Sequence, residues 1–128
     1  MHTKLGIFLI FLLATIIIAP AYANVTSVAL EKSFYINEEK ITFVGQRQAG
    51  DKFVYVIIRD STGAYKGMLS DPTSESDGTY STISRSVTQF FDIEGTYNAT
   101  AFTDSQGEKN GITIKLQYDG DKVSVLPD

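Results

Sequence analysis

The chain predicts an all-β fold, an antiparallel β-sandwich of about seven or eight short strands that follows a cleavable signal helix. From residue 24 onward, β-branched and aromatic residues alternate with polar ones in short runs. Clusters of Gly, Asn, Asp and Ser separate these runs at intervals of roughly 8 to 12 residues. No stretch after the first 23 residues has helical spacing of its apolar residues, so the sequence predicts strands and no helix there.

The amino terminus reads as a secretory signal peptide. Residues 1–4 carry one lysine, residues 5–19 form an almost unbroken apolar run, and Pro20 ends it. Residues 21–23 (AYA) have the small-x-small pattern of a signal peptidase site, so we expect cleavage between Ala23 and Asn24. The apolar run is shorter than the roughly 20 residues needed to cross a hydrocarbon core.

Two alternatives keep the apolar helix. A membrane-anchored domain would retain the chain from Met1. A pilin-like filament subunit would be cut before Ile7 and would use the helix for assembly, although Pro20 leaves that helix short. The amino-terminal residue of the mature protein distinguishes these cases.

The predicted strands follow one another with short turns between them. Residues 25–30 form a first strand that breaks at residues 31–32 and re-forms, and alternation of Ile41 and Phe43 with polar residues marks the next strand. Later runs rich in Thr, Tyr, Ile and Val, bounded by Gly, Asp and Asn, continue the pattern. The predicted strand segments are 25–30, 33–36, 40–46, 53–60, 64–69, 79–87, 96–102, 112–118 and 123–126.

Residues 53–60 (FVYVIIRD) are apolar on both faces, which indicates a central strand whose outer face is covered. If Phe53 and its alternate neighbours fill the core, then Val54, Val56 and Ile58 face outward. We therefore predict an interface at these three residues, covered by a second copy of the chain or by a larger envelope protein.

Composition excludes many activities. The chain has no cysteine and no tryptophan, and its one histidine, His2, lies in the leader. Ser-His and Cys-His nucleophile pairs, zinc sites built from Cys or His, haem ligation by these residues, iron–sulfur clusters and disulfides are therefore absent from the mature chain. The net charge is −4, from 15 acidic and 11 basic residues, which does not favour a nucleic-acid partner.

Several stretches together resemble the exported immunoglobulin-like or macroglobulin-type sandwich modules of prokaryotic envelope proteins. The matching stretches are residues 30–35 (LEKSFY), 41–45 (ITFVG), 57–63 (IIRDSTG), 76–81 (SDGTYS) and 94–101 (EGTYNATA). The resemblance implies that Tyr97 packs at a corner and returns its hydroxyl to the backbone. It also implies adhesion, scaffolding or substrate presentation without shared catalytic residues.

Two N-x-Thr sequons are candidate glycosylation sites, at Asn98 and at Asn24. Asn98 is the better acceptor if Tyr97 points inward, because alternation then turns Asn98 outward. Asn24 would be the new amino terminus. An ordinary polar residue explains each position equally well.

Aromatic and acidic residues suggest weaker sites. Tyr55, Phe90 and Phe91 would form a platform for a glycan or a partner protein, although packing explains them better. Acidic turns suggest calcium, but none has a dedicated ligand spacing, and solvated turns explain them better. The acidic sets are Asp119 with Asp121, Asp71 with Asp77, and Asp92 with Glu94.

The sequence therefore predicts a secreted, non-enzymatic binding or structural module of the cell envelope. We expect protein–protein or surface contacts, no cofactor, no catalytic residues, and membrane contact only through the signal peptide. A weak calcium- or carbohydrate-binding domain is the remaining alternative. A pair of carboxylates across a sugar cleft, as glycoside hydrolysis needs, has little room in a sandwich of about 105 residues.

Overall fold

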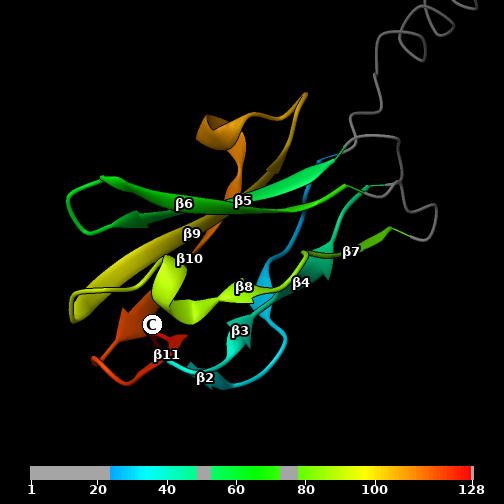
Figure 1. The fold of residues 1–128 in the computed structure, drawn as a ribbon. Helices are drawn as coiled ribbons and strands as arrows, with labels where there is room; N and C mark the ends of the chain where they lie inside the picture. The colour runs from blue at the N-terminus through cyan, green and yellow to red at the C-terminus, as the bar shows by residue number, and fades with distance from the viewer. Residues whose placement is uncertain (1–23, 49–52, 73–77, 128) are drawn as a thin grey trace, which may run out of the picture.

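A computed structural model describes residues 24–48, 53–72 and 78–127, and Figure 1 shows their arrangement. The predicted signal peptide, the turn at residues 49–52 and the loop that contains Asp77 lie outside the described residues. The described part is an all-β fold with antiparallel strand pairing, as predicted, and contains two 3-10 turns and no α-helix. The strands are β1 (Ala29–Leu30), β2 (Phe34–Ile36), β3 (Lys40–Ile41), β4 (Phe43–Gln46), β5 (Val54–Asp60), β6 (Tyr65–Asp71), β7 (Thr79–Ser81), β8 (Arg85–Ser86), β9 (Gly95–Thr103), β10 (Ile112–Tyr118) and β11 (Lys122–Val125). The 3-10 turns are η1 (Val87–Gln89) and η2 (Glu108–Asn110).

The largest sheet has six strands in the order β2-β11-β10-β9-β5-β6. Its long middle strands, β5, β9 and β10, coincide closely with runs that alternate or are wholly apolar in the sequence. The remaining strands form a three-stranded sheet, β1-β4-β7, and a two-stranded one, β3-β8. The two small sheets are built from the same two stretches of chain, since β3 is followed directly by β4 and β7 is followed by β8 (Figure 1).

Hydroxyl groups bridge the interruption between the two small sheets. The Phe43 N–H donates to Oγ1 of Thr82 at 3.0 Å, and the Thr82 N–H donates to the Phe43 carbonyl at 2.9 Å. The hydroxyls of Thr42 and Ser84 contact each other beside this break. The sequence predicted one strand over 40–46 and another over 79–87. The structure divides each of them because side-chain oxygens replace part of the main-chain ladder.

Buried side chains from the six-stranded sheet and from the small sheets form one hydrophobic cluster. Phe43 and Ile41 enter it from the small sheets, and Leu116 enters it from β10. Phe90 and Phe91, each 1% exposed, fill it from the segment after η1. Their role is therefore packing, the alternative that the sequence favoured for them.

The side chains of β5 point opposite to the predicted directions. Val54, Val56 and Ile58 are fully buried, so they cannot form the interface predicted for them. Phe53 is 42% exposed, and its alternate neighbours Tyr55 and Ile57 are half-buried on the outer face.

The register with β9 explains why Val56 and Ile58 face inward. Val56 lies opposite Ala101 and Ile58 opposite Ala99, so small alanines leave room in the core for branched neighbours. A run that is apolar on both faces does not reveal which face is buried, because only the pairing with its neighbours fixes that.

We predict that Val56→Asp lowers the free energy of unfolding by about 3 to 5 kcal/mol, because it places an unpaired carboxylate in the core. Ile57→Asp, one position away on the outer face, is the matched control and should cost about 1 kcal/mol. Urea unfolding followed by circular dichroism measures both values. A Val56→Asp protein with the wild-type midpoint would contradict the buried position.

Candidate functional site

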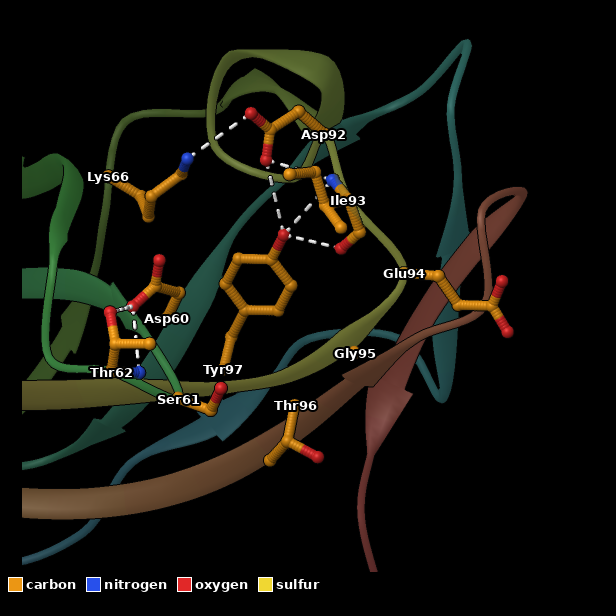
Figure 2. A pocket seen from close by; sticks show the side chains of 10 residues that line it. All are labelled: Asp60, Ser61, Thr62, Lys66, Asp92, Ile93, Glu94, Gly95, Thr96 and Tyr97. Carbon is orange, nitrogen blue, oxygen red and sulfur yellow. Dashed lines mark hydrogen bonds and ion pairs between the residues drawn. The ribbon is translucent and has the colours of Figure 1, made fainter.

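One surface depression lies where the β5–β6 hairpin meets the segment that leads into β9. It has a volume of about 220 Å³. Figure 2 shows its lining residues, Asp60, Ser61, Thr62, Lys66, Asp92, Ile93, Glu94, Gly95, Thr96 and Tyr97. The depression brings together one residue singled out from the sequence, Tyr97, and one acidic set, Asp92 with Glu94.

Tyr97 forms the wall between the depression and the core. Its ring packs edge-on against Phe91, with ring centroids 4.9 Å apart, and only 2% of the residue is exposed. Its hydroxyl donates to the carbonyl of Ile93 at 2.6 Å, four residues upstream. This is the corner geometry that the resemblance implies for Tyr97, since the hydroxyl satisfies a carbonyl of the bend that precedes β9.

Asp60 holds the hairpin on the opposite side of the depression. Its Oδ1 accepts from the N–H and hydroxyl of Thr62, at 2.9 and 2.6 Å, and from the N–H of Ala64 at 3.0 Å. These hydrogen bonds, led by the one from the Thr62 hydroxyl, lower the pKa of Asp60. Gly63, with φ at +89°, closes the turn in a conformation that favours glycine.

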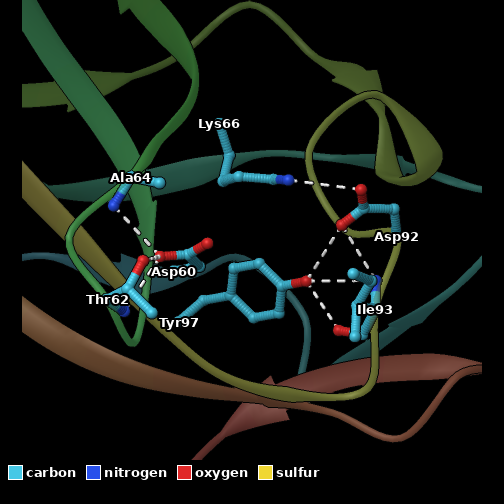
Figure 3. A network of polar contacts seen from close by, with 7 residues as sticks. All are labelled: Asp60, Thr62, Ala64, Lys66, Asp92, Ile93 and Tyr97. Atoms are coloured by element: carbon cyan, nitrogen blue, oxygen red, sulfur yellow. Dashed lines mark hydrogen bonds and ion pairs between the residues drawn. The ribbon is translucent and has the colours of Figure 1, made fainter.

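Lys66 and Asp92 connect the two sides (Figure 3). The Lys66 ammonium lies 3.2 Å from Oδ2 of Asp92, while Oδ1 accepts from the Ile93 N–H at 2.8 Å and from the Tyr97 hydroxyl at 3.3 Å. The hydrogen bond from Lys66 is the main cause that lowers the pKa of Asp92. Because the Asp92 side chain is 56% exposed, solvent screens the ion pair, which orients the segment before β9 more than it stabilises the fold.

The polar groups of this depression act on the fold itself. Asp60 and Asp92 accept hydrogen bonds from their own turns, and the carboxylate of Glu94 points away from Asp92 (Figure 2). Within the part of the chain that the structure describes, no three or more Asp, Glu, His or Cys side chains gather in a way that could hold a metal ion. The hydrogen bonds of Asp60 and Asp92 hold the hairpin turn and the bend before β9 in place.

The other acidic sets also belong to turns or strands. Asp119 accepts through Oδ1 from the N–H groups of Asp121 and Lys122, at 2.9 and 2.8 Å. Asp71 is buried and accepts from the Ser81 N–H at 3.0 Å through Oδ2, so it links β6 to β7.

A second feature is an apolar surface on the outer side of the six-stranded sheet, which we call the outer apolar face. Its members are Phe53, Tyr55, Ile57, Met68 and Phe102. The Tyr55 ring lies 6.4 Å from the Phe53 ring and 5.7 Å from the Phe102 ring, between centroids. Met68 is opposite Ile57 in the register and is 42% exposed.

Sequence reasoning found the outer apolar face only in part, because it named Tyr55 as a possible platform residue but favoured packing for it. The structure places Tyr55 half-buried between Phe53 and Phe102 on this face.

Residues 53–58 are apolar on both faces of the strand, and this pattern correctly indicated an apolar outer surface. The prediction placed Val54, Val56 and Ile58 on that surface. The structure places their alternate neighbours, Phe53, Tyr55 and Ile57, there instead. Met68 and Phe102 join the surface only through pairing with β5, which no local pattern shows. Partial burial next to Asp104 raises the pKa of the Tyr55 hydroxyl, with desolvation as the larger cause.

The two sequon asparagines occupy different environments. Asn98 is half-buried on the outer side of β9, between Arg59 and Lys115 in the register. Asn24 is half-buried at the start of the described chain, where its N–H donates to Oε1 of Gln48 at 3.2 Å.

No family model, curated protein or solved structure matches this chain. The site is therefore interpreted from its own geometry. Among the described residues, no helix has the length and apolar character needed to span a bilayer.

We predict that Tyr97→Phe lowers the free energy of unfolding by about 1 to 2 kcal/mol, because it leaves the Ile93 carbonyl without its hydroxyl donor. Tyr65→Phe is the matched control, since Tyr65 is 58% exposed and its change should stay within about 0.5 kcal/mol. Equal midpoints for both variants in urea unfolding would contradict a structural role for the Tyr97 hydroxyl.

The ion pair gives a separate prediction for pH. A pKa lowered by folding means that ionised Asp92 stabilises the fold above the ordinary value of 3.8, and that this contribution disappears as pH falls through the lowered pKa. Lys66→Met should raise the pKa of Asp92 towards 3.8, as measured by NMR titration of its carboxyl carbon. Asp60, whose strongest bonds come from its own turn, is the internal control and should shift little.

Proposed function

We propose that this chain is an exported, non-enzymatic binding or structural module of the cell envelope, built on an immunoglobulin-like sandwich. The observation that carries the proposal is the outer apolar face. The largest contiguous apolar patch on a protein that works alone in water is often a binding site. Its aromatic side chains bury large areas at low entropic cost, which suits a protein–protein contact.

Strand order supports the immunoglobulin-like assignment. In that fold, one sheet holds the strand order G-F-C with an added C′ strand, and the other holds A, B and E. The order β10-β9-β5-β6 in the large sheet and β1-β4-β7 in the small one agrees with this scheme. The Tyr97 hydroxyl also returns to the backbone near the start of β9, where the fold places its tyrosine corner. The additional strands β11 and β2 extend the large sheet beyond that scheme.

Export is proposed from the leader and from where the fold begins. The predicted cut falls between Ala23 and Asn24, and hydrogen bonds of the described fold already begin at Asn24. A leader of residues 1–23 is then followed by the domain without an intervening linker. The protein would act outside the cytoplasm, where a domain without cysteine relies on its core for stability.

A non-enzymatic role follows from how the polar groups are used. Asp60 and Asp92 accept hydrogen bonds from their own turns, and the chain has no histidine beyond His2 and no cysteine. The partner is an envelope protein or a second copy of the chain, and the acidic net charge disfavours nucleic acid.

Photo-crosslinking in the exporting cell tests this function. With a photoreactive residue in place of Phe53, we expect one discrete crosslinked product, and mass analysis of its chain should begin at Asn24. Additional mass in sugar-sized steps would assign a glycan, and peptide mapping would locate it at Asn98 or elsewhere.

Gln117 is the control position, since it is exposed on β10 of the same sheet but lies outside the outer apolar face. No product at either position, or equal products at both, would overturn the interaction surface. A chain that begins at Met1 or Ile7 would instead identify an anchored domain or a filament subunit.

A further inference from the structure

The first two described residues are held on both sides by the rest of the fold. Gln48 accepts from the Asn24 N–H through Oε1 at 3.2 Å, and its own N–H donates to the Asn24 carbonyl at 2.8 Å. Val25 is 1% exposed and pairs with Arg47 in an antiparallel bridge. The backbone is therefore part of the folded structure from Asn24 onward.

Gln106 closes the other side of Val25. Its Oε1 accepts from the Val25 N–H at 3.0 Å, and its Nε2 donates to the Val25 carbonyl at 3.2 Å. The same amide accepts from the Thr103 N–H at 3.2 Å and donates to the Asn110 carbonyl at 3.0 Å. All four hydrogen-bonding positions of the side-chain amide are thus occupied, and Gln106 is only 8% exposed. The side chain acts towards Val25 as a neighbouring strand would.

This arrangement conflicts with cleavage of the folded chain. A peptidase binds its substrate as an extended strand and contacts main-chain groups next to the bond that it hydrolyses. Proteolytic sites accordingly lie where the backbone is exposed and free of structure. The residue after the predicted cut has its N–H and carbonyl occupied by Gln48, and the next residue is buried.

The buried Oδ1 of Asn24 is a second, independent observation. This atom has no hydrogen-bond partner among the described residues. In the uncut chain, Asn24 has a single N–H, which Gln48 occupies. Hydrolysis adds water across the Ala23–Asn24 bond, leaving a carboxylate on Ala23 and an ammonium on Asn24, which gives Asn24 two further N–H donors.

We propose that Gln106 and Gln48 form a clamp that receives the new amino terminus, so that signal peptidase must cut before Asn24 and Val25 dock. Once the clamp has closed, Asn24 and Val25 on the carboxyl side of the predicted cut are held by the fold, and a chain that folds first stays uncut. This inference rests on the proposed export function and adds an order of events to it. It assigns Gln106 to the control of maturation.

The test uses the full chain, made in a cell-free system with detergent micelles. Purified signal peptidase is present during synthesis in one arm and is added after folding in the other. We expect a product that begins at Asn24 in the first arm and cleavage at least roughly tenfold slower in the second. Equal rates in the two arms would overturn the clamp while leaving the leader in place. No Asn24 product in either arm would overturn the leader itself, and with it the proposed order of events.

Gln106→Ala should accelerate the late cleavage about tenfold, since it removes the four hydrogen bonds of the amide. Gln117→Ala is the matched control and should leave the late rate unchanged, because Gln117 is exposed on β10.

If Gln106→Ala fails to fold, hydrogen exchange of the Val25 amide tests whether the clamp holds the amino-terminal segment. The wild-type product should exchange this amide slowly, as a clamped group does. Exchange as fast as that of an exposed loop amide would overturn the clamp.

Discussion

Seven residues of β5 pair with seven of β9, from Val54 opposite Thr103 to Asp60 opposite Tyr97. This register turns the branched side chains of β5 into the core beside Ala99 and Ala101, and it leaves their alternate neighbours outside. At one end it brings the Asp60 turn to the tyrosine corner. At the other end Thr103 donates to Gln106, which holds Val25. A shift of one residue would reverse the faces and separate both ends from their contacts.

Local patterns predicted much of the fold because alternation and turn residues are local properties. The strands β5, β9 and β10 begin and end within a few residues of the predicted runs, and the Tyr97 hydroxyl has the contact expected of it. The features that the sequence did not predict depend on pairing between segments that are distant in the chain. The buried face of β5 depends on small residues more than 40 positions later, and the divided strands depend on hydroxyls that approach across a sheet. Gln106 lies between the predicted strands 96–102 and 112–118, where a glutamine carries no signal until its amide is seen beside Val25.

Because the chain has no cysteine and so no disulfide, its stability depends on packing and hydrogen bonds. Phe90 and Phe91 pack edge-on in the core, and Tyr97 joins them through its ring. Side-chain amides and hydroxyls then complete the ladders at the margins, as Thr82 and Gln106 do. Such contacts form only when segments distant in the sequence have docked. The amino-terminal segment should therefore be among the last to become protected as the chain folds.

The interrupted strands at the margin of the small sheets have a consequence for self-association. A long, flat and unpaired edge strand is a template on which further chains add to build fibrils. Here β7 has only three residues and β8 only two. Between these strands, the hydroxyl of Thr82 accepts the N–H of Phe43 in place of a main-chain carbonyl. On the far margin of the large sheet, β6 has an irregular register beside Arg59, and the Ile83 N–H already occupies the Ser70 carbonyl. These features shorten or interrupt both margins, so high protein concentration should favour contacts between faces over fibrillar growth.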